Sequence, residues 1–328
     1  MTMVTVSVII TFYNQEKYVD STMRSVMNQK TNFDFEIIAG DDGSTDGTYG
    51  EIKKWIDKYP DRISYYNRSR DDGVTVTGFR ASRNRLDLLT HVKGKYFIFL
   101  DGDDYFSDEN KLQKQVDILE KDENSDCAAC SHYIEALYPD GHKLALPVYK
   151  LKEGKYDLKS YWAKLYFHTD TTLVRSSVIE KLPADYVINN FNDNLITFLI
   201  LLQGKIYFLP EKMAIYLQTG DGIWTSKKMI VNHIRNMFMY DMCLELDPES
   251  KGLSQVRNAK SWRYLYKHRR EIKRDELEPF RKEAEDRNLI CSALFLNYKT
   301  LRPASKIRLT RRYAGVLLRF VIHKLTGR

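Results

Sequence analysis

The chain has 328 residues, of which 43% are hydrophobic. This length allows one large domain or one and a half ordinary ones, and the hydrophobic content supplies a real core, which excludes a disordered chain. The formal net charge of +7 is uneven, because the residues from Lys251 to the end hold 21 Lys and Arg against 7 Asp and Glu, whereas the first 250 residues hold 30 against 37.

The first hundred residues alternate between predicted strands and predicted helices. Short runs of apolar, β-branched and aromatic residues predict buried strands over 5–11, 35–40, 63–66 and 96–100. Apolar residues that recur every three or four positions predict helices from about Gln15, over 52–59 and over 84–92. This alternation predicts an α/β fold with a doubly wound, mostly parallel sheet. No export signal precedes the first strand and no run approaches the ~18 apolar residues that span a bilayer, so we expect a cytoplasmic protein.

The loop after the second strand is acidic. Asp41 and Asp42 stand at the end of the strand, where carboxylates can accept hydrogen bonds from a nucleobase or a ribose. An Asx-rich turn with an N-cap at Asp46 or Thr48 explains Asp46, but it leaves Asp41 and Asp42 unexplained. We therefore favour nucleoside binding at this loop.

Three acids follow the fourth strand directly. Asp101, Asp103 and Asp104 stand at its carboxyl end, which is the edge of an open α/β sheet where ligands bind. Three carboxylates repel one another there unless a cation joins them. With no Cys or His close by in the sequence, oxygen ligands favour Mg²⁺ or Mn²⁺, which usually share their coordination with substrate phosphates. Taken alone, the cluster equally fits a solvated turn that caps the helix starting near Asn110.

The pattern loosens in the second half of the chain. After a helix over 110–121, a hairpin is expected over 127–138 and 143–149. Cys127 and Cys130 form one CxxC pair without a second pair or a nearby His, so reduced thiols are expected and zinc is not. The other expected elements are helices over 156–166 and 193–202 and strands over 171–174, 206–209 and 213–217. From about Ser226 only helices are expected, near 228–245, 253–285, 289–298 and 303–325.

Three segments together carry a family resemblance. They are VSVIITFYNQE over 6–16, EIIAGDDGSTDGT over 36–48 and LDGDD over 100–104. In order, spacing and strand context they resemble the family 2 glycosyltransferases of the GT-A fold, over about residues 4–224, although members usually have Pro where this chain has Thr11. The resemblance implies a catalytic domain over 1–225, with a nucleotide-binding half of about 1–105 and an acceptor half of about 106–225, and a helical, basic C-terminal region over 226–328.

The resemblance also implies a donor site. Thr11, Tyr13 and the side chain of Asp42 are expected to hold the nucleotide base, with Asp41 as a further candidate. Arg83, in a segment that resembles the family's donor-site Arg-Asn pair, is expected to compensate phosphate charge, although it equally fits a surface position.

The acids after the fourth strand resemble the family's DXD element. Asp101 is expected to bind the ribose of the donor, and Asp103 and Asp104 are expected to contact a metal that holds the donor diphosphate. Such a metal stabilises charge on the departing oxygens.

Asp193 is the candidate catalytic base. Asn192, Asp193 and Asn194 open a predicted helix and resemble the segment in which family members place this carboxylate. One base without a second nucleophile implies direct displacement with inversion at the anomeric carbon. A helix N-cap is the structural alternative, and the two roles do not exclude each other.

Three further residues are candidates for the acceptor side or a lid. His168 and Asp170 precede a predicted strand and are expected in the acceptor wall, although a lone His there also fits a structural role. Trp224 ends the segment 216–224, which resembles the family's closing segment, and it fits either stacking on a sugar or a core position. Members often have His where this chain has Thr219 or Gly220.

The C-terminal segment 306–325 predicts an amphipathic helix with a basic rim. Such a helix can lie in the plane of an anionic membrane, where each basic residue adds ~1 kcal/mol of attraction. A helix that packs on the catalytic domain, or on a second subunit of a homo-oligomer, predicts the same stripe. Nucleic acid is not expected, because no reading module accompanies the charge.

Together these features predict a metal-dependent, inverting glycosyltransferase. It would transfer a sugar from a nucleoside diphosphate sugar, by resemblance a UDP-sugar, to a hydroxyl of a glycan or a lipid-linked acceptor. Bacterial surface-polysaccharide assembly at the inner face of the membrane is the expected setting. Two alternatives stay open, namely a sugar-nucleotide pyrophosphorylase, although 11–14 lacks the Gly-rich loop of those enzymes, and a non-catalytic nucleotide-sugar binding protein.

Overall fold

The computed structural model describes residues 4–146, 150–162, 167–219, 229–248 and 274–286, and a few separate positions between 261 and 318. The chain divides into two compact units, Met1–Gly220 and Asp221–Arg328. Trp224 lies outside the described residues, as does the predicted boundary at 225, and so does most of the segment 306–325.

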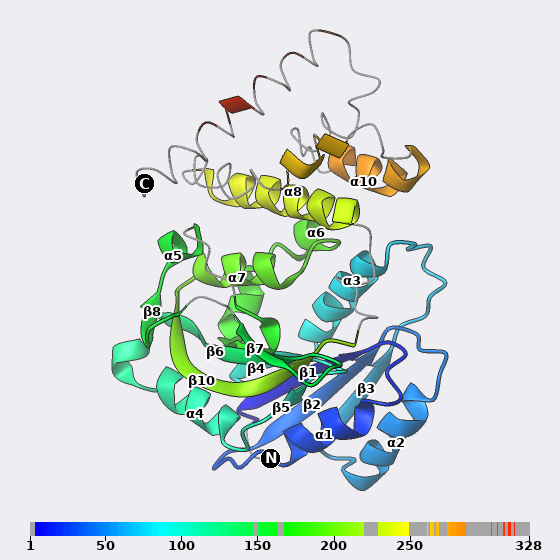
Figure 1. Ribbon diagram of the computed structural model, residues 1–328. Coiled ribbons are helices and arrows are strands. Elements are labelled where there is room, and N and C mark those ends of the chain that lie inside the picture. Colours follow the sequence, from blue (N-terminus) through cyan, green and yellow to red (C-terminus); the bar gives the residue numbers. More distant parts are fainter. Residues whose placement is uncertain are drawn as a thin grey trace. The chain divides into compact units, whose positions relative to one another are not determined.

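A ten-stranded sheet forms the centre of the first unit (Figure 1). Its first four strands are parallel and run in the order β3-β2-β1-β4. Their bounds are β1 Val6–Phe12, β2 Phe35–Asp41, β3 Ile63–Asn67 and β4 Tyr96–Asp101. The helices between them are α1 Val19–Met27, α2 Thr48–Lys58 and α3 Thr77–Leu89. The prediction of a doubly wound, mostly parallel sheet is confirmed.

The strand β1 shows why this part of the chain forms a core. Val6, Val8, Ile9 and Ile10 are fully buried, so the strand is covered on both of its faces. One face packs against apolar residues of α1, α2 and the later helix α4 (Lys111–Leu119). On the other face Leu88 of α3 packs against Gly40 so closely that a Cβ atom on Gly40 would lie 2.3 Å from it.

The second half of the unit extends the same sheet with mixed strand directions. β9 (Leu173–Arg175) pairs antiparallel with both β4 and β6 (Cys127–Leu137), and β6 pairs parallel with β10 (Lys205–Leu217). Three short strands add to it, β5 Tyr105–Phe106, β7 Lys143–Leu146 and β8 Gly154–Tyr156. The helices are α5 Leu158–Trp162, α6 Ala184–Val187 and α7 Asp193–Leu201, with 3-10 turns η1 Asp122–Asn124, η2 Thr169–Thr171 and η3 Ser176–Lys181.

Several boundaries differ from those predicted. The two strands expected over 206–209 and 213–217 form the single strand β10, whose register shifts between Leu209 and Ala214. Helix α3 begins at Thr77, well before the expected start at 84. The prediction missed this start because the first turns of the helix are mostly polar and no apolar stripe marks them. The helix expected over 156–166 begins only after β8, and its last part lies outside the described residues.

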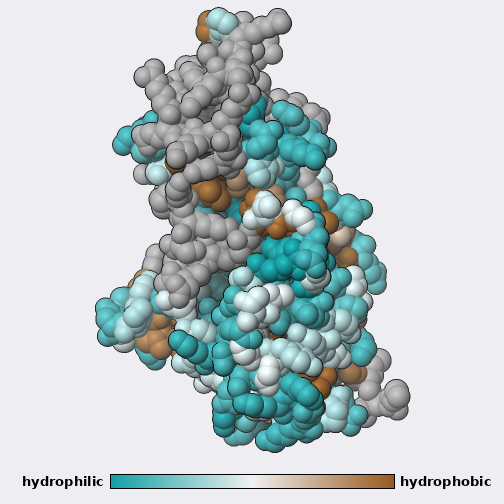
Figure 2. Space-filling view, turned by 90° about the vertical axis from the view of Figure 1, so that its right-hand side faces the viewer, coloured by the Kyte–Doolittle hydropathy of each residue, from teal (hydrophilic) through white to brown (hydrophobic). Residues whose placement is uncertain are grey.

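The second unit contains α8 (Met229–Leu246) and α10 (Arg274–Asp286). The expected helix near 289–298 lies outside the described residues. Among the helices that the structure describes, none combines the length and the apolar character needed to cross a bilayer. On the face drawn in Figure 2, the described surface is mostly hydrophilic, and apolar residues gather there only in small groups.

Candidate active site

The two acidic loops meet at one edge of the sheet. Strand β1 lies between β2 and β4, and its register places Phe12 opposite Asp41 and Thr11 opposite Asp101. The residues that follow β2 and β4 stay hydrogen-bonded to β1. The backbone N–H of Asp42 donates to the carbonyl of Phe12 at 2.9 Å, and that of Gly102 donates to the carbonyl of Thr11 at 2.9 Å. Parallel strands thus bring together acids that are far apart in the sequence, at the edge where such sheets bind ligands.

Asp41 folds the first of these loops. Its carboxylate accepts hydrogen bonds from the backbone N–H of Ser44 at 2.8 Å, from the Ser44 hydroxyl at 2.6 Å and from the Tyr65 hydroxyl at 3.1 Å. Asp46 accepts from the backbone N–H of Thr48 at 3.0 Å, as the Asx-turn interpretation expects, but the N-cap of α2 is Gly47, so the expected cap at Asp46 or Thr48 is wrong. One oxygen of Asp41 is therefore occupied by the loop itself and the other by Tyr65 of β3.

Asp42 lies beside two arginines, one of which stacks on an aromatic ring. Arg70 donates from Nη2 to Oδ2 of Asp42 at 3.0 Å and from Nε to its carbonyl at 2.7 Å, while its guanidinium lies 3.5 Å from the ring centre of Tyr13. Nε of the buried Arg80 lies 3.7 Å from the same carboxylate. Burial raises the pKa of Asp42, and Arg70 and Arg80 oppose that rise. Tyr13 is 38% exposed, so a planar ligand can reach its ring from solvent.

The acids after β4 point in two directions. Asp101 and Asp103 are half-buried, whereas Asp104 is fully buried and its Oδ1 accepts from the backbone N–H of Leu217 at 2.8 Å. Burial and the neighbouring Asp101 raise the pKa of Asp103 to about 7. The cap residue of α4 is Asn110, so the alternative of a solvated, helix-capping turn is wrong for these acids.

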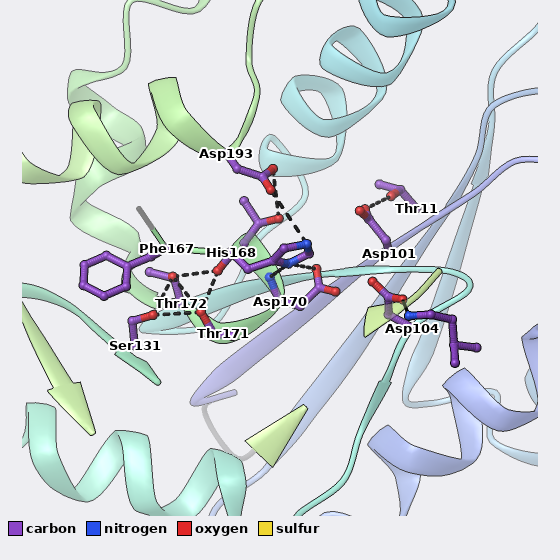
Figure 3. A network of polar contacts seen from close by, with 12 residues as sticks. Thr11, Asp101, Asp104, Ser131, Phe167, His168, Asp170, Thr171, Thr172 and Asp193 are labelled. Atoms are coloured by element: carbon purple, nitrogen blue, oxygen red, sulfur yellow. Dashed lines mark hydrogen bonds and ion pairs between the residues drawn. The ribbon is translucent and has the colours of Figure 1, made fainter. Parts of the chain in front are cut away.

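His168 and Asp170 lie beside Asp104 (Figure 3). One ligand atom from each of the three residues lies within 4.8 Å of those of the other two, and all three side chains are buried. His168 Nδ1 is 3.5 Å from Asp170 Oδ1. Among the described residues, neither oxygen of Asp170 and only one oxygen of Asp104 has a hydrogen-bond partner. Buried carboxylate oxygens without donors fit a bound cation.

The titratable groups of this cluster shift one another's pKa values. Burial, together with Asp170, holds the pKa of Asp104 well above its usual range. Burial acts against a charged His168, but Asp170 and then Asp193 outweigh it and raise the pKa of His168 to about 9. The sequence predicts oxygen ligands alone, whereas the structure also places His168, which is distant in the sequence, beside Asp104.

A buried polar network holds the loop that carries His168 and Asp170. Gln115 of α4 donates from Nε2 to the carbonyl of Cys130 at 2.7 Å and to that of Thr171 at 2.8 Å. Lys111 Nζ, which is fully buried, donates to Gln115 Oε1 at 2.9 Å, and burial lowers the pKa of Lys111 to about 7. Helix α4 thus holds η2 in place through the side chain of Gln115.

Asp193 is the first residue of α7 and points toward His168 (Figure 3). The N-cap is its neighbour Asn192, whose side chain accepts from the backbone N–H of Leu195 at 3.2 Å, so the capping alternative for Asp193 is wrong. Asp193 Oδ1 accepts from Arg85 Nη1 at 3.1 Å, and Asp193 Oδ2 lies 3.9 Å from His168 Nε2.

Two arginines of α3 have different surroundings. Arg85 joins Asp193 to Asp101, whose Oδ1 accepts from Arg85 Nη2 at 2.7 Å and from the Thr11 hydroxyl at 3.1 Å. Arg83 Nε donates to Asn189 Oδ1 at 3.0 Å, and its expected role toward phosphate stays a prediction. Arg85 and Arg70 cannot be identified from sequence patterns, because their acidic partners come from other elements.

Comparisons with known proteins point to one family. A family model described as glycosyl transferase family 2 matches residues 7–183. An uncharacterized protein of Mycobacterium tuberculosis is 29% identical over 222 residues, which cover 67% of this chain and 60% of that protein. The minor teichoic acid biosynthesis protein GgaA of Bacillus subtilis is 29% identical over 203 residues, which cover 61% of this chain and 44% of that protein. The chain therefore spans less than two thirds of these relatives.

Solved structures show a similar fold. S. aureus TarS in complex with UDP-GlcNAc has a TM-score of 0.63 at 17% identity, covering 95% of this chain and 90% of that one. A mannosyltransferase of Pyrobaculum calidifontis in complex with GDP-Man and Mn²⁺ has a TM-score of 0.51 at 13% identity, covering 98% and 87%. At such identities the likeness concerns the fold alone.

Proposed function

The chain belongs to glycosyl transferase family 2 and has its GT-A fold, and from this we propose that it is a metal-dependent, inverting glycosyltransferase. It transfers a sugar from a nucleoside diphosphate sugar to a hydroxyl group of a glycan or a lipid-linked acceptor. The observation that carries the proposal is the meeting of Asp42, Asp101, Asp103 and Asp193 around one edge of the sheet, with buried, unpartnered carboxylate oxygens beside them.

The donor's nucleoside binds at the ends of β1 and β2. The base lies against Tyr13 and Arg70, which offer flat surfaces for stacking, and Asp42 accepts a hydrogen bond from a base N–H. Asp101, which is half-buried at the end of β4, accepts from the ribose. UDP is the proposed carrier, supported by the likeness to TarS bound to UDP-GlcNAc.

The metal is Mn²⁺ or Mg²⁺, held by Asp103 and Asp104 together with His168 and Asp170. Asp103 is the more exposed of the four and would face the donor diphosphate, whereas the other three are buried and lie together. When bound, the ion stabilises the charge that develops on the departing diphosphate. Because an imidazole favours Mn²⁺ over Mg²⁺, Mn²⁺ is the preferred ion.

Asp193 acts as the base. The acceptor oxygen attacks the anomeric carbon and gives its proton to the Asp193 carboxylate, while the bond from that carbon to the diphosphate breaks and the nucleoside diphosphate leaves. One carboxylate and a single displacement invert the anomeric configuration, so an α-linked donor gives a β-linked product.

The setting that we propose is surface-polysaccharide assembly at an anionic membrane surface. The name of the relative GgaA supports it, and so do the exposed positions of the basic C-terminal region. Among the described positions of that region, Ile307 and Leu318 are 55% and 61% exposed. Exposed apolar side chains in a basic segment suit a membrane surface, or contact with a second copy.

The test is a transfer assay with a panel of UDP-, GDP- and dTDP-sugars, Mn²⁺ and oligosaccharide or lipid-linked acceptors. The variant Asp193→Asn is expected to lose at least about 100-fold in kcat, because a positioned base contributes about that much, while donor binding is retained. Asp57→Asn, an exposed residue of α2 paired with Lys53, is the matched control and should transfer at the wild-type rate. A fully active Asp193→Asn variant would show that the base lies elsewhere. Formation of nucleoside triphosphate from donor and pyrophosphate would favour a pyrophosphorylase instead.

A further inference from the structure

Arg85 connects Asp101, the proposed ligand of the ribose, to Asp193, the proposed base. It lies on α3 with its side chain 11% exposed, and its two terminal nitrogens reach different partners, Asp101 at 2.7 Å and Asp193 at 3.1 Å. Its guanidinium also lies 5.6 Å from the ring centre of Phe99 on β4. The side chain therefore joins β4, α3 and α7 at the edge of the sheet.

We infer that Arg85 is a positioning residue that fixes the base Asp193 relative to the donor-binding Asp101. The inference rests on the proposed function and extends it. If the base and the donor are held by one rigid group, the acceptor oxygen attached to the base meets the anomeric carbon in a defined geometry. Misplacement of a reacting group by about 1 Å can cost about 100-fold in rate.

The shape of the guanidinium suits this task. Arginine is a planar fork with donors at fixed angles, whereas lysine offers a compact ammonium on a flexible stem. Asp193 Oδ1 also accepts from the Thr169 hydroxyl at 3.3 Å, so two donors from different elements restrain one carboxylate oxygen. A lysine at this position keeps the positive charge, but its donors sit on one nitrogen of a flexible stem, so it does not hold the two carboxylates at a fixed separation.

Electrostatics point the same way. Without Arg85, Asp101 and Asp193 would repel each other in a partly buried site, and each would be free to turn toward other donors. Burial acts against a charged Arg85, but Asp101 and then Asp193 outweigh it and raise the pKa of its guanidinium, so the group stays charged.

Arg175 offers a matched control at the opposite end of β4. It donates from Nε to the carbonyl of Cys127 at 2.8 Å and from Nη1 to the Tyr96 hydroxyl at 3.1 Å, so it also joins several elements. It has no role in the proposed chemistry. Arg175→Lys should therefore lower the melting temperature without changing kcat.

The experiment measures kcat for transfer and the donor dissociation constant in the full-length chain with Mn²⁺, for Arg85→Lys, Asp193→Asn and the double variant. Arg85→Lys is expected to lose at least about 100-fold in kcat, with a much smaller change in donor affinity. Because Arg85 acts through Asp193, the double variant should be no slower than Asp193→Asn alone. In Arg85→Ala, added guanidinium ion should restore part of the lost rate, and it should not affect Arg175→Lys.

Two results would overturn the inference while leaving the enzyme intact. The first is an Arg85→Lys variant with wild-type kcat, and the second is a double variant whose loss equals the product of the two single losses. If Arg85→Lys does not fold, as judged by thermal unfolding, the guanidinium rescue of Arg85→Ala decides, and absence of rescue in a folded variant counts against the inference. A wild-type chain that transfers no sugar overturns the proposed function instead, and with it the reaction that Arg85 would serve.

Discussion

At the scale of single residues, the site is an arrangement of carboxylates whose charge the protein alone does not balance. Asp103 shows this most clearly, because burial and Asp101 raise its pKa to about 7 in the metal-free chain. A neighbouring divalent cation would reverse that effect by favouring the ionised form. The protonation of Asp103 is therefore a direct readout of the metal site.

The raised pKa predicts how stability depends on pH. A carboxyl group that holds its proton more tightly in the folded chain stabilises the fold fully below its ordinary pKa, and this contribution is lost as the pH rises through about 7. We expect the melting temperature measured in EDTA to fall over this range for the wild type and to fall less for Asp103→Asn. Mn²⁺ should restore the wild type most strongly at the high end of the range, since the ion displaces the proton. A melting temperature in EDTA that rises between pH 5 and pH 7, and equally in both proteins, would contradict the pKa assigned to Asp103.

The residues that sequence patterns could identify are those next to strand ends. Asp41, Asp42, Asp101 and Asp103 follow buried strands directly, so their meeting at one sheet edge could be predicted. The partners of these acids could not, since Arg70 lies in a loop and Arg85 on a helix face among several other arginines. His168 was expected in an acceptor wall, and only the folding of its loop against β4 brings it to Asp104.

At the scale of elements, α4 and β6 hold the loop that carries part of the site. The loop that carries His168 and Asp170 has little regular structure of its own beyond η2. It is held by the Gln115 amide, and by the hydroxyl of Ser131 in β6, which lies 2.8 Å from that of Thr171. Helix α4 thus has a function in addition to covering the sheet.

This role of α4 predicts the effect of Gln115→Leu. The change removes three buried hydrogen bonds, because it leaves the carbonyls of Cys130 and Thr171 without that donor and Lys111 Nζ without its acceptor, so we expect a loss of about 2 to 4 kcal/mol in the free energy of unfolding. Affinity for Mn²⁺ should fall as well, because the loop shifts. Gln113→Leu, on the more exposed side of the same helix, is the control and should cost about 1 kcal/mol or less. Urea unfolding and Mn²⁺ titration measure both quantities, and a stability unchanged by Gln115→Leu would rule out the supporting role.

Element boundaries were predictable only where apolar periodicity marks them. The strands β1, β2 and β4 are buried runs and were placed within a residue or two. The polar start of α3 has no apolar periodicity to mark it. Pro210 predicts a break between two strands, but β10 continues through it by shifting its register against β6.

At the scale of the whole molecule, the chain couples an acidic unit to a basic C-terminal region. The proposed membrane contact assigns that region a task, which is to keep the enzyme near a lipid-linked acceptor. Electrostatic attraction to an anionic surface depends on the number of basic groups and on salt.

This task predicts binding to anionic vesicles. The full-length chain is expected to sediment with phosphatidylglycerol vesicles at low salt and to be released as salt is raised. Replacing Arg308, Arg311 and Arg312 with Gln should weaken the binding by roughly 100-fold, at ~1 kcal/mol for each charge, whereas uncharged vesicles should bind neither protein. If the two proteins sediment equally, the basic rim serves another purpose, and an oligomer measured by light scattering would then be the better explanation.

The central claim is that an activated sugar binds this chain through a cation held by the acids after β4. Calorimetric titration of the full-length chain with the UDP-sugar that the transfer panel selects, with Mn²⁺ and again with EDTA, tests it most directly. The account predicts binding that requires Mn²⁺ in the wild type and is lost in Asp103→Asn. Binding of equal affinity in EDTA, or in the Asp103→Asn variant with Mn²⁺, would contradict it.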